Sequence, residues 1–399
     1  MTIRAIKQFA WIALFCFAAP PLQAGAAATI GFLENRVRQD PLDFIAQNRL
    51  ARSYIQRLRL HGDLRDLQRA ETAARASLES LPRSLNPGGL VVRAEVELEA
   101  HHFAAALQLA RQALELNPRN RSALAIQGDA ELELGNYSKA HAIYAKLAET
   151  GDSPPILARQ ARLAELNGER EKALVLLNQA VRGGLWYRIR LGELYFRSGE
   201  LEQAEAQYQT AFQKSPHSAP VLTHLAELRG AQARFQEAFR LYRKAIARVP
   251  RAEYLQALGD LYQFIGDAAP AKAWHARALS AYRQSVADGN AHYLHHLAGF
   301  FSDVEENPEK ALYWANLDLE MRHSIYAYDT LAWAHYKHGN QDQAREFIGK
   351  ALILNTEDAH LLYHAGMIFS RAGEFARGQA YLKRCVEINP AYNAFHMHR

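Results

Sequence analysis

Histidine is the residue type whose spacing in this chain could support chemistry. Among 17 histidines in 399 residues, His292, His295 and His296 lie three and four positions apart, which would place them on one face of a helix. Imidazole nitrogens in that arrangement could bind a metal ion. Metal sites usually add a carboxylate or a thiolate, but the nearest acids, Asp303 and Glu305, lie a helical turn or more away. We therefore predict no metal site and expect these histidines to line a polar, π-rich binding surface.

Motifs of known enzyme classes are missing from the sequence. It contains no glycine-rich phosphate loop, no HExxH zinc-protease motif, no GxSxG nucleophile elbow and no CxxC pair. We therefore predict that the chain is not an enzyme and that it needs no cofactor.

The charge of the chain is mildly basic. The formal net charge is +5, and it falls to +3 (5 − 2) if Arg4 and Lys7 are removed with the leader discussed below. The basic residues are scattered without a run, so the sequence lacks the footprint of a nucleic-acid-binding protein.

A repeat with a period near 34 residues must position these side chains. A small residue opens each copy, at Ala94, Gly128, Ala161, Gly192, Ala226, Gly259, Ala298, Ala332 and Gly366. A second small residue follows most of them after twelve positions, a glycine often lies between the two, and a proline often ends the pattern. Two antiparallel helices can approach closely only where both side chains are small, glycine permits the left-handed turn between them, and proline cannot continue a helix.

This pattern resembles the tetratricopeptide repeat over nearly the whole chain. The resemblance implies an all-α solenoid, a right-handed superhelix of about ten helix-turn-helix repeats over residues 48–390. Residues 29–47 would form an N-terminal capping segment and residues 391–399 a short C-terminal tail. Each repeat would contact only its neighbours, and a scaffold of this kind binds other molecules and rarely catalyses.

The N-terminus is typical of a leader. Arg4 and Lys7 form a charged start, an apolar run over residues 9–19 is too short to span a bilayer, and small residues follow at positions 24–28. We predict that residues 1–28 are a cleaved signal peptide and that the protein is exported to the periplasm or cell envelope. An uncleaved anchor is the alternative. Cleavage would remove Cys16 and leave Cys385, which we expect to be a buried small hydrophobe.

The resemblance also implies where a partner would bind. Ligand contacts in this family come from the second, fifth, ninth and twelfth repeat positions, counted here with the small residue as the eighth. The ninth position carries acids in five copies, and the later copies carry aromatic residues, histidine and methionine at these positions. The predicted contacts are Glu95, Asp129, Glu193, Glu227, Asp260, His292, His295, Tyr326, Trp333, Tyr336, His360, Tyr363 and Met367.

The predicted groove is thus acidic in its first two thirds and aromatic in its last third. Ordinary solvated helix faces would also explain the acids, and core packing between helices would explain the aromatic residues. The lysines and asparagines with which the family grips the acidic C-termini of chaperones are absent, so we exclude that ligand class.

These features predict a non-catalytic scaffold in the cell envelope that holds an extended peptide or a partner loop in its concave groove. One alternative is a structural subunit of an envelope assembly or a polysaccharide export complex, and another is a protein that binds a small molecule or sugar among the histidines and aromatic residues. Membrane association would occur only through a partner.

The C-terminal end could support a homodimer. Nine residues follow Pro390, which is too short a segment to cover the flank of a hairpin. We expect the face that carries Ile368, Tyr381, Leu382 and Cys385 to stay partly open. The alternative is that Tyr392 and Phe395 fold back over it.

Overall fold

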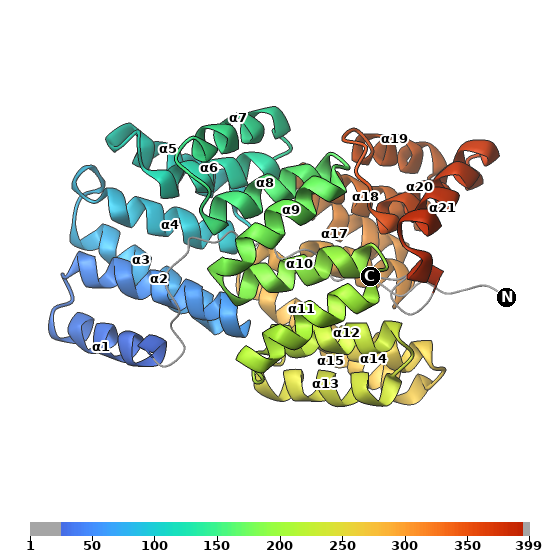
Figure 1. The fold of residues 1–399 in the computed structure, drawn as a ribbon, viewed down its shortest axis with the longest axis horizontal. Coiled ribbons are helices and arrows are strands. Elements are labelled where there is room, and N and C mark those ends of the chain that lie inside the picture. The colour runs from blue at the N-terminus through green and yellow to red at the C-terminus, as the bar shows by residue number, and fades with distance from the viewer. Residues whose placement is uncertain (1–24, 394–399) are drawn as a thin grey trace.

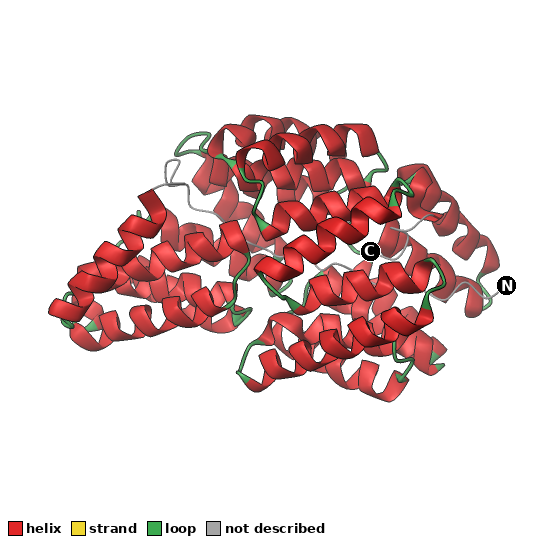
Figure 2. Ribbon diagram, turned by 90° about the horizontal axis from the view of Figure 1, so that it is seen from below, coloured by secondary structure: helices red, strands yellow, loops and turns green. Residues whose placement is uncertain are grey.

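A computed structural model describes residues 25–393, which form 21 α-helices and no strand (Figures 1 and 2). The first ten helices are α1 (Gly25–Gln39), α2 (Phe44–His61), α3 (Arg65–Ser80), α4 (Pro87–Glu99), α5 (Phe103–Leu116), α6 (Arg121–Glu133), α7 (Tyr137–Ala148), α8 (Pro154–Leu166), α9 (Arg170–Ala180) and α10 (Leu185–Arg197). The others are α11 (Leu201–Lys214), α12 (Ala219–Ala231), α13 (Phe235–Arg248), α14 (Ala252–Phe264), α15 (Ala268–Ala287), α16 (Leu294–Asp303), α17 (Pro308–Met321), α18 (Ile325–His338), α19 (Gln341–Ala351), α20 (Ala359–Arg371) and α21 (Phe375–Ile388).

The helices from α2 to α21 pair into ten consecutive antiparallel hairpins within the described residues. The small residues of the repeat lie at the crossings: Gly192 and Ala204 are both buried, and a side chain on Gly192 would collide with the ring of Tyr208. The predicted all-α solenoid of about ten repeats is therefore confirmed. The extra residues near position 280 extend α15 to 20 residues, longer than any other helix described.

The first hairpin is preceded by a capping helix. Ile30 and Leu33 of α1 are buried against α2, and the Asp43 carboxylate accepts a hydrogen bond from the Ala46 amide, which caps the start of α2. The first repeat thus begins at residue 44, slightly before the predicted residue 48. Residues 1–24 of the predicted signal peptide lie outside the described residues. No helix in the described part of the chain is long and apolar enough to cross a membrane.

The superhelix closes on itself after one turn. The His323 amide donates to the Glu133 carbonyl at 3.1 Å, the Thr356 hydroxyl to the Leu166 carbonyl at 2.5 Å, and the Asn389 side-chain amide to the Arg197 carbonyl at 3.0 Å. Thr356 and Leu166 lie 190 residues apart, which is about five and a half repeats. We call this line of contacts the seam. It corrects the expectation that each repeat contacts only its neighbours.

The seam follows a regular pattern. Glu133, Leu166 and Arg197 are the last residues of α6, α8 and α10, which are the first helices of three successive repeats. Their partners lie in the loops before α18 and α20 and just after α21. The C-terminal end of each of these three helices thus contacts a non-helical segment that lies one superhelical turn later in the chain.

The C-terminal end is covered in part. Tyr392 is buried, and its hydroxyl lies 2.9 Å from Nδ1 of His360. Cys385 and Ile368 are buried as well, and burial raises the pKa of the Cys385 thiol to about 12. The expectation of a partly open face was therefore wrong for Ile368 and Cys385, because a short turn of 3-10 helix (Pro390–Asn393) folds the chain back. Tyr381 and Leu382 of the same face are only half-buried, as expected. Phe395 lies outside the described residues.

Candidate functional site

The predicted acidic face is buried instead of open. Glu95, Asp129, Glu227 and Asp260 are each no more than 5% exposed, and the Glu193 side chain is 22% exposed. The expectation of accessible acids, whether in a groove or on solvated helix faces, was therefore wrong for the first four. Their part in partner binding stays a prediction.

Each acid is paired inside the chain. The Asp129 carboxylate accepts a hydrogen bond from the Arg159 guanidinium at 2.6 Å and another from the Tyr144 hydroxyl at 2.6 Å. Glu95 lies 3.1 Å from Arg59, and Asp260 lies 2.8 Å from Nε2 of His275. These acids therefore contact partners inside the chain, and the pairs direct their carboxylates away from a ligand in the groove.

Three of the cationic partners follow the register of the repeat. Arg159, Arg190 and His224 each lie two positions before the small residue of their copy, the same register in three successive repeats. Arg190 and His224 both contact Glu193, and His224 lies 3.2 Å from Glu227. Counting only the ligand positions of the family missed this row of cations.

The pair of Glu193 and His224 is held strongly in its charged form. Burial opposes the charge of Glu193, but Arg190 and His224 outweigh it and lower its pKa to about 2. Burial likewise opposes the charge of His224, but Glu193 and Glu227 raise its pKa to about 10. Because Glu193 lies on α10 and His224 on α12, the pair joins the first helices of two repeats.

The predicted aromatic positions are packed between the last repeats. Trp333 is 4% exposed, donates its indole N–H to the Asp303 carboxylate and stacks on His364 with centroids 4.0 Å apart. Core packing therefore explains Trp333. Its stacking partner Tyr336 is half-buried, as are Tyr326, His360, Tyr363 and Met367.

The first predicted histidine belongs to the seam. His292 is buried, with Nδ1 3.2 Å from Nε2 of His101 and Nε2 3.0 Å from Arg251. His295 is buried, and neither of its ring nitrogens has a hydrogen-bond partner among the described residues. Burial and the neighbouring positive and histidine groups lower the pKa of both imidazoles well below the usual range. Both are thus neutral near pH 7.

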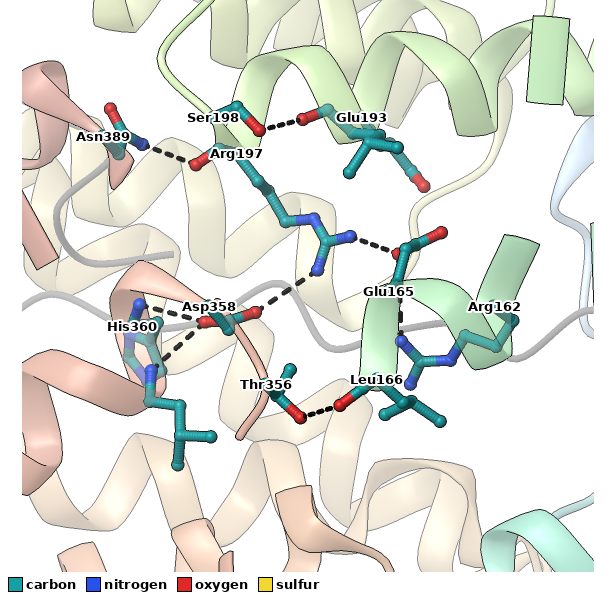
Figure 3. Close-up of polar contacts among 12 residues, drawn as sticks. Arg162, Glu165, Leu166, Glu193, Arg197, Ser198, Thr356, Asp358, His360 and Asn389 are labelled. Atoms are coloured by element: carbon teal, nitrogen blue, oxygen red, sulfur yellow. Dashed lines mark hydrogen bonds and ion pairs between the residues drawn. The ribbon is translucent and has the colours of Figure 1, made fainter. Parts of the chain in front are cut away.

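The seam carries its own ion pairs (Figure 3). The Arg197 guanidinium at the end of α10 lies 2.7 Å from Glu165 of α8 and 3.3 Å from Asp358, which caps the start of α20. Around these groups only a small gap of about 30 Å³ remains. This space holds about one water molecule and is too small for a ligand.

A ligand-sized cleft lies elsewhere, between α2, α6 and α8. Its volume is about 480 Å³, within the range of typical binding pockets. Its lining combines an apolar floor, neutral polar groups and three arginines, and among the described residues that line it none is acidic. The lining residues are Arg52, Gln56, Arg121, Ser122, Ala125, Leu147, Ser153, Pro155, Ile156 and Arg159. We call it the arginine cleft.

Two of the three arginines are available to a ligand. Arg159 is buried and saturated by Asp129. The Arg52 side chain is 40% exposed and lies 3.8 Å from Glu95, a long contact. Arg121, the first residue of α6, is exposed and forms no ion pair with any described residue. The cleft therefore presents positive charge above the buried floor of Leu147 and Ile156.

The arginine cleft was missed by sequence reasoning. Its cations come from three repeats and from positions outside the family's contact set, so no local spacing marks them. The sequence does show that no acid lies near Arg121, which is a sign of an unpaired cation. Only the packing of α2 beside α6 and α8 shows that this arginine faces the cleft.

Comparisons with known proteins agree with the architecture. Two family models of the tetratricopeptide repeat match the chain, one over residues 91–154 and 189–253 and the other over residues 359–392. The human protein O-mannosyl-transferase TMTC1 is 26% identical over 210 residues, which are 51% of this chain but only 23% of that protein.

Two solved structures are similar as well. A tetratricopeptide repeat protein from Parabacteroides merdae has a TM-score of 0.44 at 22% identity and covers 60% of this chain and 92% of its own. The human IFIT1 dimer with PPP-AAAA has a TM-score of 0.48 at 14% identity, covering 90% and 94%.

Proposed function

This chain is a tetratricopeptide repeat protein, built on a scaffold for protein interaction, and we propose that it binds an acidic segment of a partner protein in the arginine cleft. The observation that carries the proposal is the composition of that cleft: two accessible guanidinium groups beside an apolar floor, without an acid in the described lining. The protein acts as an adaptor, without catalysis.

The chemistry of the lining defines the ligand. Guanidinium groups bind carboxylates through paired N–H donors, and these charge-assisted hydrogen bonds are stronger than neutral ones. Gln56, Ser122 and Ser153 can bond to the backbone of a bound peptide, and the floor accepts an apolar side chain. A short segment that alternates acidic and apolar residues fits this combination.

The closed seam favours this cleft over the interior. The acids and histidines predicted to contact a ligand are paired or packed within the superhelix, and freeing them would leave buried charges without partners. The arginine cleft needs no such rearrangement.

A peptide titration tests the proposal. The probe is a fluorescein-labelled octapeptide of alternating glutamate and leucine, with a lysine and leucine peptide as its counterpart. We expect the mature chain to bind the acidic peptide more tightly, and added salt to weaken the binding. Arg121→Glu should reduce the affinity at least about tenfold. Arg119→Glu, the same charge change at an exposed residue outside the cleft, should leave it nearly unchanged.

Two results would reject the site. One is equal affinity for the acidic and basic peptides. The other is an equal loss of affinity in the two arginine variants, because that would indicate a diffuse effect of net charge.

We further propose that the partner lies in the cell envelope. The support is the leader-like sequence of residues 1–28. The full chain expressed in a bacterium should appear in the periplasm with a new N-terminus near residues 25–29. Recovery of cytosolic protein that still begins at Met1 would contradict this location.

A further inference from the structure

Three potential metal ligands converge where α18 packs beside α20. Asp329 comes from α18, and His360 and His364 come from α20. The two histidines are four residues apart and so share one face of the helix. One ligand atom from each of the three side chains lies within 4.8 Å of the other two.

The spacing of two of these atoms suits a shared ion, and the third, from His360, lies within 4.8 Å of both. Nδ1 of His364 lies 2.9 Å from Oδ1 of Asp329. Two ligand atoms at about 2.1 Å from one ion are about 3.0 to 3.4 Å apart for angles between 90° and the tetrahedral value. Shifts of a few tenths of an ångström would therefore let both atoms bind the same ion.

Surrounding groups hold the imidazoles in place. The His364 ring stacks on the Trp333 indole at an interplanar angle of 10°, and Trp333 is itself fixed by its hydrogen bond to Asp303. Nδ1 of His360 lies 2.9 Å from the Tyr392 hydroxyl. Such outer contacts orient the histidines of metal sites and tune them as ligands.

We propose that Asp329, His360 and His364 form a binding site for Zn²⁺. Two imidazoles with one carboxylate favour zinc over calcium or magnesium, which prefer oxygen ligands alone. Three protein ligands leave a fourth position for water or for a donor from a bound molecule. His360 is half-buried, whereas the other two ligands are buried, so the open position lies on the His360 side.

The ion would link the last two repeats of the solenoid. Asp329 belongs to the ninth repeat and the histidines to the tenth, and Tyr392 links His360 to the turn that covers the C-terminal end. The same His360 lies two residues after Asp358, which pairs with Arg197 across the seam (Figure 3). Zinc would therefore stabilise the covered end.

Calorimetric titration of the full mature chain with Zn²⁺ tests this inference. The protein carries no affinity tag and is first dialysed against a chelator. His396 and His398, which lie outside the described residues, are replaced by alanine throughout so that the tail cannot supply ligands. We expect about one equivalent of Zn²⁺ to bind, a rise in Tm on addition of the metal, and a Co²⁺ form with the absorption of a low-coordinate site.

Variants separate a metal site from a set of hydrogen bonds. Asp329→Asn and His360→Ala should each weaken Zn²⁺ binding at least about tenfold, and His141→Ala, at an exposed histidine of α7, should not. Circular dichroism checks that each variant is folded. Uptake below a tenth of an equivalent by the parent, or equal uptake in the parent and the Asp329→Asn variant, would overturn the proposal.

Discussion

At the scale of single residues, the turn glycines carry two different constraints. Gly135 and Gly339 both end the first helix of a repeat with positive φ, at +77° and +95°. A side chain at Gly339 would meet open space. One at Gly135 would lie 2.5 Å from the carbonyl oxygen of His323, across the seam. The sequence predicts the first constraint from the local turn but is silent on the second.

Matched alanine substitutions should separate the two constraints. Gly339→Ala should lower the free energy of unfolding by about 1 kcal/mol, the cost of a left-handed alanine. Gly135→Ala has the same conformational cost, and its side chain would also collide with the seam. We therefore expect the free energy of unfolding to fall by about 2 to 4 kcal/mol. Urea unfolding measures both values. Equal losses would show that the contact between Gly135 and His323 is not formed in solution.

At the scale of helices, the sequence was a good guide to the hairpins and a poor guide to what joins them. Small residues such as Gly192 and Ala204 mark the crossings because only they allow close approach. The ion pairs between hairpins involve residues about one repeat apart, such as Asp129 and Arg159. Their register was visible, but without the packing an acid on a first helix could equally face solvent.

The pair that joins α10 to α12 should make stability depend on pH. The folded pKa of His224, about 10, lies above its unfolded value of 6.5, so its stabilisation is complete below pH 6.5 and is lost as pH rises through 10. The folded pKa of Glu193, about 2, lies below its unfolded value, so its contribution is lost only as pH falls from about 4.5 through 2.

His224→Asn should therefore lower Tm much more at pH 6 than at pH 10.5. Thermal melts followed by circular dichroism at the two pH values give the comparison. His141→Asn is the control, because His141 is exposed on α7 and should show little effect at either pH. A Tm loss for His224→Asn that is the same at both pH values would mean that packing, and not charge, explains it.

At the scale of the whole molecule, closure of the superhelix decides which surfaces are available. Contacts such as that between His101 and His292 span 191 residues and arise from small rotations summed over several repeats. No local pattern encodes that sum, so sequence reasoning placed the ligand in an open groove. The structure instead buries four of those five acids and offers a ligand-sized opening at the arginine cleft.

Hydrogen exchange at the His323 amide tests the closed seam most directly. This amide lies in the loop between α17 and α18, where it has no partner within its own repeat, and it donates to the Glu133 carbonyl. We predict slow exchange, comparable to that of the adjacent helices, and faster exchange at this amide in the Gly135→Ala variant. Exchange at the rate of an unprotected loop in the parent chain would contradict closure, and with it the argument that directs binding to the arginine cleft.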